Sequence, residues 1–285
     1  MTKSVTKKKL RDLFVPFLIF FGYLVLSVVV FLIFQNMDVS PFIQTILTDG
    51  LVCVLLGVPA CVYAFKHRPG PDEERVKFSA FGWLMILFTF CCMYVTAEGL
   101  GNWIRVIAPI GLTDTYTEMT TEDLYMYLAM AVTVGPIAGE LIFRRYMFRV
   151  FRNSFSFWPS SLMSSVLFTV FHGTAMHIPV TMALLLFLTV LYEVTGRFRL
   201  CMIFHILFNY MGATFLFDSH ATPPVMIVCY GLVVAAMVLS YVFRDFVFGK
   251  MLRAGGIQQF ESYLDEKRKH FGEPKDQSDD RDTKS

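Results

Sequence analysis

Long apolar runs are the sequence feature that most constrains the fold of this chain. Roughly eight of them follow one another, and most reach the about 18–25 residues that a helix needs to cross a bilayer. A hydrophobic content of 55% over 285 residues is typical of membrane proteins and argues against a soluble domain. The sequence therefore predicts an all-α, polytopic integral membrane protein of about eight transmembrane helices. The expected spans are residues 13–34, 42–65, 78–98, 123–143, 157–172, 176–195, 200–217 and 223–243.

Basic residues are concentrated on one side of these expected spans. Of the 25 lysines and arginines, all but Arg105 lie in the terminal segments or in the segments that follow spans two, four and six. Cytoplasmic segments of membrane proteins are enriched in Lys and Arg, so this pattern predicts a multi-pass protein of the cell membrane with both termini cytoplasmic. With a net charge of only +2, the basic residues are expected to contact membrane lipid, and no nucleic-acid partner is expected.

The chain divides into three expected parts. Residues 1–12 form a basic cytoplasmic N-terminus, residues 13–245 form the membrane domain, and residues 246–285 form a cytoplasmic tail. The sequence after Phe271 is too polar to bury a core, so the tail is expected to be partly disordered. Apolar residues at helical spacing also predict one short amphipathic helix in the tail, on the inner membrane surface. These residues are Ile257, Phe260, Tyr263 and Leu264.

Five polar residues lie inside or at the edge of the apolar runs. They are Glu140, Arg144, His172, His205 and Asn209. Burying an ionisable group in hydrocarbon costs several kcal/mol, so such residues usually pair, line a cavity or take part in chemistry. Glu140 and Arg144 are four residues apart, as are His205 and Asn209, so each pair shares one face of a helix. This spacing makes the five residues the candidate functional core.

Three segments around these residues follow a known order of motifs. They are GPIAGELIFRRYMF at 135–148, SVLFTVFHG at 165–173 and FHILFNYMG at 204–212. Together they resemble the motifs of the CPBP family of intramembrane proteases, which comprises CAAX proteases and bacteriocin-processing enzymes and is also called the Abi family. The family pattern is Glu-Glu-X-X-X-Arg, then Phe-X-X-X-His, then His-X-X-X-Asn, on separate membrane helices. The resemblance places a CPBP-like core at residues 125–215.

The resemblance implies an activity and a set of site residues. It implies an intramembrane endopeptidase that hydrolyses a peptide bond of a membrane-associated peptide or protein. The implied catalytic residues are Glu140, His172, His205 and Asn209, and the implied supporting residues are Arg144, Gly139 and Phe168. The fifth run is short, so its helix is expected to begin late or to end within the bilayer, which would bring His172 level with Glu140.

Gly139 departs from the family pattern at an important position. It stands where the family has the first glutamate of its first motif, the residue taken to activate the hydrolytic water. Neighbouring residues on an α-helix are separated by about 100° around the axis. Glu140 can therefore take the place of the missing carboxylate only if the helix is locally rotated or unwound.

Two chemistries remain open for the residues that are present. In the first, Glu140, His172 and His205 hold a divalent metal such as zinc, which acidifies its own bound water. Sharing one metal requires the rings of His172 and His205 to lie within about 10 Å of each other, since metal–ligand distances are about 2 Å. In the second, no metal is present, a histidine positions the water, and Asn209 donates to the oxyanion.

Two further functions are compatible with the sequence. Gly139 favours a catalytically degenerate pseudoprotease that acts as a membrane scaffold or as an immunity or regulatory factor. Glu140, His172 and His205 could instead form the proton relay of an ion-coupled transporter, although the runs show no matched pair of broken helices. Close to the site, Gly135 and Pro136 are expected to kink the fourth helix.

Overall fold

The computed structural model describes most of the expected membrane domain and part of the tail. It describes residues 3–35, 76–107, 129–171, 178–216 and 256–271 continuously, together with residue 125 and separate positions within 44–62 and 231–251. All elements formed by these residues are helices, which confirms the all-α class. The second and eighth expected spans lie largely outside the described residues, so the count of eight spans stays a prediction.

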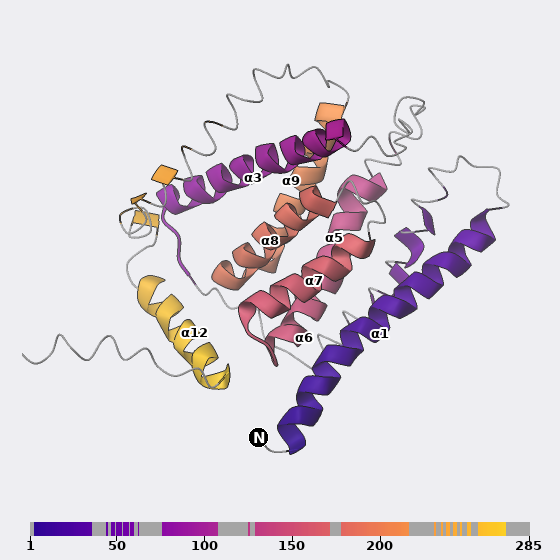
Figure 1. Cartoon of the computed structure of the whole chain (residues 1–285), viewed down its shortest axis with the longest axis horizontal. Coiled ribbons are helices and arrows are strands. Elements are labelled where there is room, and N and C mark those ends of the chain that lie inside the picture. Colours follow the sequence, from indigo (N-terminus) through magenta and orange to yellow (C-terminus); the bar gives the residue numbers. More distant parts are fainter. Residues whose placement is uncertain are drawn as a thin grey trace, which may run out of the picture.

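The helices of the described part follow the apolar runs closely. They are α1 (Lys3–Phe34), α3 (Ala80–Ile107), η1 (Met130–Val134), α5 (Gly135–Glu140), η2 (Leu141–Phe148), α6 (Arg149–Arg152), α7 (Phe157–Phe171), α8 (Ile178–Thr195), α9 (Phe198–Leu216) and α12 (Gly256–Phe271). The last of these confirms the helix that apolar spacing predicts in the tail. Figure 1 shows α8 between α3 and α7, with α1 along the opposite side of the bundle.

Two of these helices are long and apolar enough to cross a membrane. They contain Leu10–Phe34, with a mean hydropathy of 2.9, and Ala80–Ala97, with a mean hydropathy of 1.8. Shorter apolar helical stretches occur at Phe157–Val170, Val180–Thr195 and Phe198–Gly212. Much of α1 presents apolar side chains outward, and Leu18 is 72% exposed. Such an outward apolar face is expected of a helix that meets lipid, because hydrocarbon and not water is then its solvent.

Residues 130–152 form one helical run that changes type along its length. The two π-helical segments, η1 and η2, flank the six-residue helix α5, and α6 follows without a break. Pro136 has no backbone N–H, so it cannot form the α-helical bond to the preceding turn, and a π-helical turn precedes it. The run also extends past residue 143, where the fourth span was expected to end. It can do so because Arg144 and Arg152 are buried and form hydrogen bonds with residues of α8.

The apolar core consists of two main clusters that meet at α8. One joins α3, α8 and α9 through aromatic contacts, such as Phe90 with Phe204 at a centroid distance of 4.9 Å. The other joins η2, α6 and α7 and includes Leu185 of α8. Because α8 packs against α3, α7 and α9, it fixes the relative positions of the helices that carry the polar residues.

Polar side chains fasten one end of the bundle. Arg152 donates through Nε and Nη2 to Oε1 of Glu193 on α8, at 3.1 and 2.7 Å, and the Tyr263 hydroxyl donates to the same oxygen at 2.6 Å. The Ser154 hydroxyl donates to Oδ2 of Asp12 at 2.7 Å, and both side chains are buried. Together these bonds connect α1, α6, α8 and α12 at one polar end.

Candidate active site

The centre of the candidate site is a direct contact between Glu140 and His205. Glu140 is the last residue of α5, and its Oε1 lies 2.8 Å from Nδ1 of His205 on α9. Glu140 is 0% exposed and His205 is 2% exposed. The structure thus joins the first and third motifs, which are 65 residues apart in the sequence, in one buried contact.

Arg144 completes a buried charge cluster. Its Nε lies 3.4 Å from Oε2 of Glu140, which is the ion pair expected from their spacing of four residues. Its Nη2 donates to the backbone carbonyl of Leu185 at 3.0 Å. Arg144 is itself 0% exposed, so Glu140 supplies the counter-charge that makes its burial tolerable.

Some hydrogen-bonding atoms of this cluster have no bonding partner among the described residues. They are Oε2 of Glu140, and Nε and Nη1 of Arg144. Buried polar atoms nearly always form hydrogen bonds, with protein or with ordered water, because leaving them dry is costly. The atoms that remain open are therefore where water or a substrate group can bind.

Phe168 forms the wall between these residues. Its ring lies 5.6 Å from the His205 ring and 4.7 Å from the Phe143 ring, measured between centroids. Cζ of Arg144 lies 5.6 Å from the centre of the same ring, within the range of a cation–π contact. Phe168 thus restricts both the imidazole and the guanidinium to narrow positions.

Gly139 packs directly against this wall. A Cβ atom placed on Gly139 would lie 2.8 Å from Cε2 and 3.3 Å from Cζ of Phe168. Because 2.8 Å is closer than carbon atoms approach one another, any side chain at position 139 requires the ring to move. The space that a carboxylate at position 139 would need is filled by Phe168 in this structure.

The helix changes type directly after Glu140. The π-helical segment η2 begins at Leu141, and its hydrogen bonds skip one residue more than α-helical bonds do. Residues after Glu140 therefore turn by a smaller angle than an α-helix would impose. This change in winding follows Glu140, whereas Gly139 and Glu140 themselves lie in the α-helical segment α5, so it does not rotate Glu140 relative to position 139. The carboxylate of Glu140 contacts Nδ1 of His205, and its taking the place of the missing carboxylate stays a prediction.

The remaining predicted residues are placed differently. Asn209 is half-buried on α9, four residues after His205, and thus on the same face of that helix. His172 follows the last residue of α7, Phe171, and lies outside the described residues. Its distance to His205 therefore stays a prediction.

The geometry can be compared with what a metal site requires. No group of three or more metal-binding side chains occurs within the described residues, and His172 is not among them. If Nδ1 of His205 donates to Glu140, its Nε2 is free to bind a metal, and Glu140 becomes the carboxylate that orients the histidine. In that form Nε2 of His205 is the one metal-binding atom of the predicted set that the described residues provide, and the set of Glu140, His172 and His205 stays a prediction.

Two partners in this region have no signature in the sequence. The carbonyl of Leu185 binds Arg144, and backbone carbonyls occur at every residue. Glu193 accepts hydrogen bonds from Arg152, which is 41 residues away in the sequence. The sequence does carry one further signal in α7: Ser161, Ser165 and Thr169 are spaced four residues apart, and all three side chains are buried in the structure.

Comparison with known proteins bears directly on this region. Residues 121–211 match the model of a protein family described as "Type II CAAX prenyl endopeptidase Rce1-like". No curated protein and no solved structure matches the chain. The matched segment includes Glu140, Arg144, Phe168, His205 and Asn209, and the family is one of membrane-embedded proteases. The match, together with the motif order, supports the assignment of this chain to the CPBP family of CAAX-type proteases.

Proposed function

We propose that the chain is an intramembrane endopeptidase that hydrolyses a peptide bond in a membrane-associated peptide or protein. The observation that carries this proposal is the buried contact of 2.8 Å between Glu140 and His205, within a segment that matches a protease family. A buried carboxylate–histidine pair is a common way to prepare a general base, since the carboxylate fixes the orientation of the ring.

The pair suggests a division of labour at the reacting atoms. Glu140 accepts a hydrogen bond from Nδ1–H of His205, so the proton stays on the ring and Nε2 keeps its lone pair as an acceptor. Nε2 takes a proton from the attacking water as the water oxygen bonds to the carbonyl carbon. The same proton then passes to the leaving nitrogen as the C–N bond breaks. His205, held by Glu140, would thus do the work that Gly139 cannot do.

Arg144 and Asn209 fit supporting roles in the same reaction. The open donors of Arg144 are placed to bind a water or a substrate carbonyl beside Glu140. Asn209 shares a helix face with His205 and carries an amide that can donate to the developing oxyanion. A divalent metal such as zinc, if bound through Nε2 of His205 and through His172, would supply the acidified water in place of the base.

A degenerate pseudoprotease is the second candidate function. The observation that favours it is the packing of Phe168 into the space where the family has a carboxylate. In that function the protein would bind a peptide or a partner protein without cleaving it, as a membrane scaffold or as an immunity or regulatory factor.

Purified full-length protein in lipid nanodiscs distinguishes the two functions. Fluorogenic peptides with and without an attached farnesyl group are the probes, and bound metal is measured in the same samples. Wild type should cleave one of them, and His205→Ala should lower the rate by about 10²–10⁴-fold, the usual contribution of a general base. Absence of cleavage by wild type, with cellular function intact in His205→Ala, would favour the scaffold.

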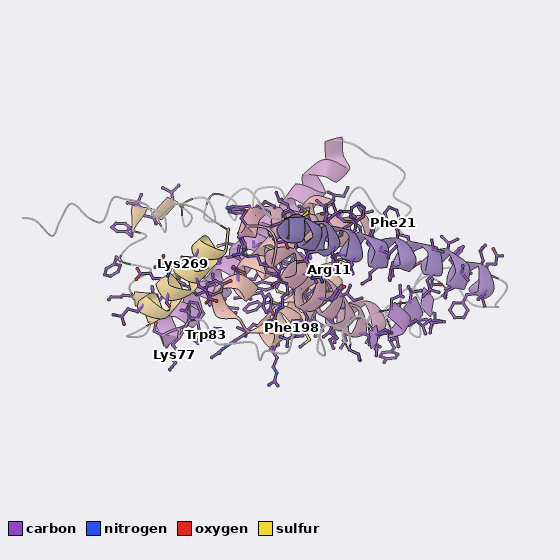
Figure 2. All side chains as sticks on the ribbon, turned by 90° about the horizontal axis from the view of Figure 1, so that it is seen from below. Arg11, Phe21, Lys77, Trp83, Phe198 and Lys269 are labelled. Atoms are coloured by element: carbon purple, nitrogen blue, oxygen red, sulfur yellow. The ribbon has the colours of Figure 1, made fainter. Side chains whose placement is uncertain are left out.

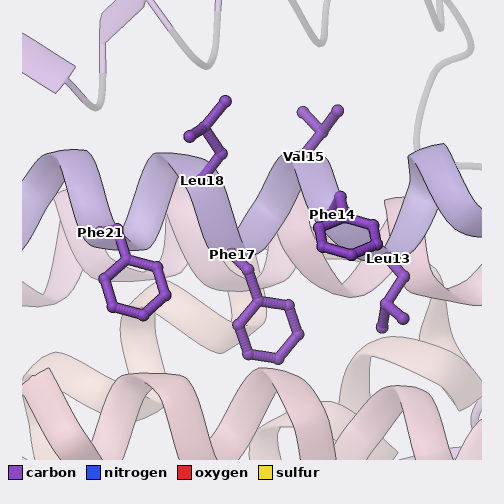
Figure 3. A pocket seen from close by; sticks show the side chains of 6 residues that line it. All are labelled: Leu13, Phe14, Val15, Phe17, Leu18 and Phe21. Carbon is purple, nitrogen blue, oxygen red and sulfur yellow. The ribbon is translucent and has the colours of Figure 1, made fainter.

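We also propose that the protein lies in the cell membrane with both termini cytoplasmic and with lipid around α1. An apolar cavity of about 530 Å³ along α1 is lined by Leu13, Phe14, Val15, Phe17, Leu18 and Phe21, and such a surface suits acyl chains (Figure 3).

Lys77 and Lys269 lie toward the same end of the molecule (Figure 2). In a cysteine-free background, cysteines at these two exposed positions should resist impermeant thiol reagents in intact cells, and one at Thr115 should react. Labelling of both lysine positions from outside would reverse the orientation.

A further inference from the structure

Helix α7 carries buried hydroxyl groups of two kinds. Ser160 and Ser164 are 0% exposed and bonded, Ser160 to the carbonyl of Ser156 at 2.8 Å and Ser164 to that of Phe143 at 2.9 Å. Ser161, Ser165 and Thr169 are just as deeply buried, at 0%, 0% and 6% exposed. Their hydroxyl oxygens have no hydrogen-bond partner within the described part of the chain.

The three open hydroxyls form a line along one face of α7. They are spaced four residues apart, so they follow one another at about 6 Å along the helix and extend over about 12 Å. A water molecule about 2.8 Å from each of two oxygens spans roughly 5.6 Å. Single waters can therefore bridge Ser161 to Ser165 and Ser165 to Thr169.

The line leads from the polar end of the bundle to the candidate site. Ser161 lies in the second turn of α7, after the segment that holds Arg152 and Ser154. Thr169 follows Phe168, whose ring contacts His205 and lies beneath the Arg144 guanidinium. The Thr169 end of the line is thus next to the residue that contacts both His205 and Arg144.

An independent observation points to water near the Thr169 end of the line. Oε2 of Glu140 and Nη1 of Arg144 are fully buried and are likewise without a partner among the described residues. Interior polar atoms left open by the protein are commonly bonded to ordered water, which needs two to four polar partners. Carboxylate, guanidinium and hydroxyl groups together provide that number.

We propose that internal water molecules occupy the line Ser161–Ser165–Thr169 and supply water to the Glu140–Arg144–His205 cluster. Hydrolysis in a membrane-embedded site consumes one water per bond cleaved, so the site needs such a supply. That last step rests on the proposed peptidase function, whereas occupancy by water does not. The competing explanation is a dry seam in which small serines let neighbouring helices approach closely.

Hydroxyl-radical footprinting in ¹⁸O-water tests the occupancy without any substrate. Microsecond radiolysis generates radicals from bound water in place, so Phe168, which is only 3% exposed, should be oxidised if water lies beside it. The Ser165→Ala variant should lower Phe168 labelling about fivefold, as expected for loss of one hydrogen bond of ordinary strength. Ser164→Ala is the matched control, because its hydroxyl is equally buried but already bonded, and it should leave the labelling unchanged. Unlabelled Phe168 in the wild type, or equal labelling in all three proteins, overturns the proposal.

Hydrolysis rates provide the second arm of the test. Combining Ser161→Ala, Ser165→Ala and Thr169→Val should lower kcat at least about fivefold with KM little changed, whereas Ser160→Ala with Ser164→Ala should not. Labelled Phe168 in a wild type that cleaves nothing would uphold the water line and reject the peptidase. Normal cleavage by the triple variant, with Phe168 unlabelled, would reject the water line and leave the peptidase intact.

Discussion

Two buried glutamates show how differently this protein uses a carboxylate. Oε1 of Glu193 receives three hydrogen bonds, two from Arg152 and one from Tyr263, from helices at the polar end. Oε1 of Glu140 meets one histidine nitrogen, and among the described residues its Oε2 has the longer 3.4 Å ion pair with Arg144 and no hydrogen bond. The hydrogen bonds to Glu193 hold helices together. Glu140 has an oxygen that can still accept a hydrogen bond, so it can bind water or a substrate group.

The aromatic surroundings of the two regions reinforce this contrast. On α9, Phe204 faces α3 and closes an aromatic cluster with Phe90 and Phe187. The next residue, His205, faces Glu140. One helix therefore contributes packing energy on one side and chemistry on the other, which predicts that stability and activity can be altered separately.

The largest effect is expected from Glu140→Gln. The amide cannot fix the histidine as a carboxylate does, so hydrolysis should fall by about 10²–10⁴-fold. The free energy of unfolding should fall as well, by about 3–5 kcal/mol, because the change leaves Arg144 buried without this counter-charge. The rate is therefore compared per folded molecule. Glu261→Gln, at an exposed position on α12, serves as the control and should behave as wild type in both measurements. An active Glu140→Gln protein would remove the distinction between the two glutamates.

Glu193→Gln should lower stability without a comparable loss of activity. Removing the charge leaves Arg152 buried without its counter-charge, which typically costs about 3–5 kcal/mol. The free energy of unfolding should fall accordingly, while the rate per folded molecule stays within about threefold of wild type, a change smaller than one hydrogen bond of 1 kcal/mol would cause. A loss of activity as large as that of Glu140→Gln, without destabilisation, would contradict a fastening role.

Gly139 allows a smaller but sharper test of the site. Gly139→Ala should destabilise by about 1–3 kcal/mol, because the added methyl group displaces the Phe168 ring. Gly22→Ala on α1 is the matched control, since nothing lies within 4 Å of that position, and it should be neutral or slightly stabilising. Gly139→Glu should be destabilised for the same reason, and combining it with Phe168→Ala should restore its stability. If the double variant also hydrolyses faster than Phe168→Ala alone, a carboxylate at position 139 can act as the base. A stable Gly139→Ala protein would show that the ring moves freely.

The smallest effect is expected from Tyr263→Phe. It removes one of the three hydrogen bonds to Glu193 and should cost about 0.5–1.5 kcal/mol. Limited proteolysis should then cut within α12 sooner, while the membrane helices stay protected. Ser262→Ala, at an exposed neighbouring position, should not change the cleavage rate. Identical digestion of wild type and both variants would mean that the Tyr263–Glu193 hydrogen bond does not hold α12 in place.

Local pattern predicted much of this architecture. The runs at 157–172, 176–195 and 200–217 differ from α7, α8 and α9 by only a few residues at either end, because apolar length and helix formation depend on nearby residues. The pairing of Glu140 with Arg144 follows equally from a spacing of four residues. These predictions needed no knowledge of how the helices pack.

Other features depend on packing between distant segments and could not be predicted. The helix was expected to end near Arg144, yet it continues to Arg152 because Leu185 and Glu193, both on α8, satisfy those arginines. The close contact of Gly139 with Phe168 likewise depends on the angle between two helices. Sequence spacing within one helix carries no information about that angle.

The bond between Asp12 and Ser154 has a consequence for biosynthesis. The two residues are 142 positions apart, so Asp12 is made long before its partner exists. At typical rates of chain elongation this delay is on the order of ten seconds. During that time the basic residues that precede Asp12, Arg11 among them, are available as counter-charges, and Asp12 is expected to remain in the headgroup layer. The first helix can therefore settle against the bundle only after the segment around Ser154 has left the ribosome, which sets an order for assembly in the membrane.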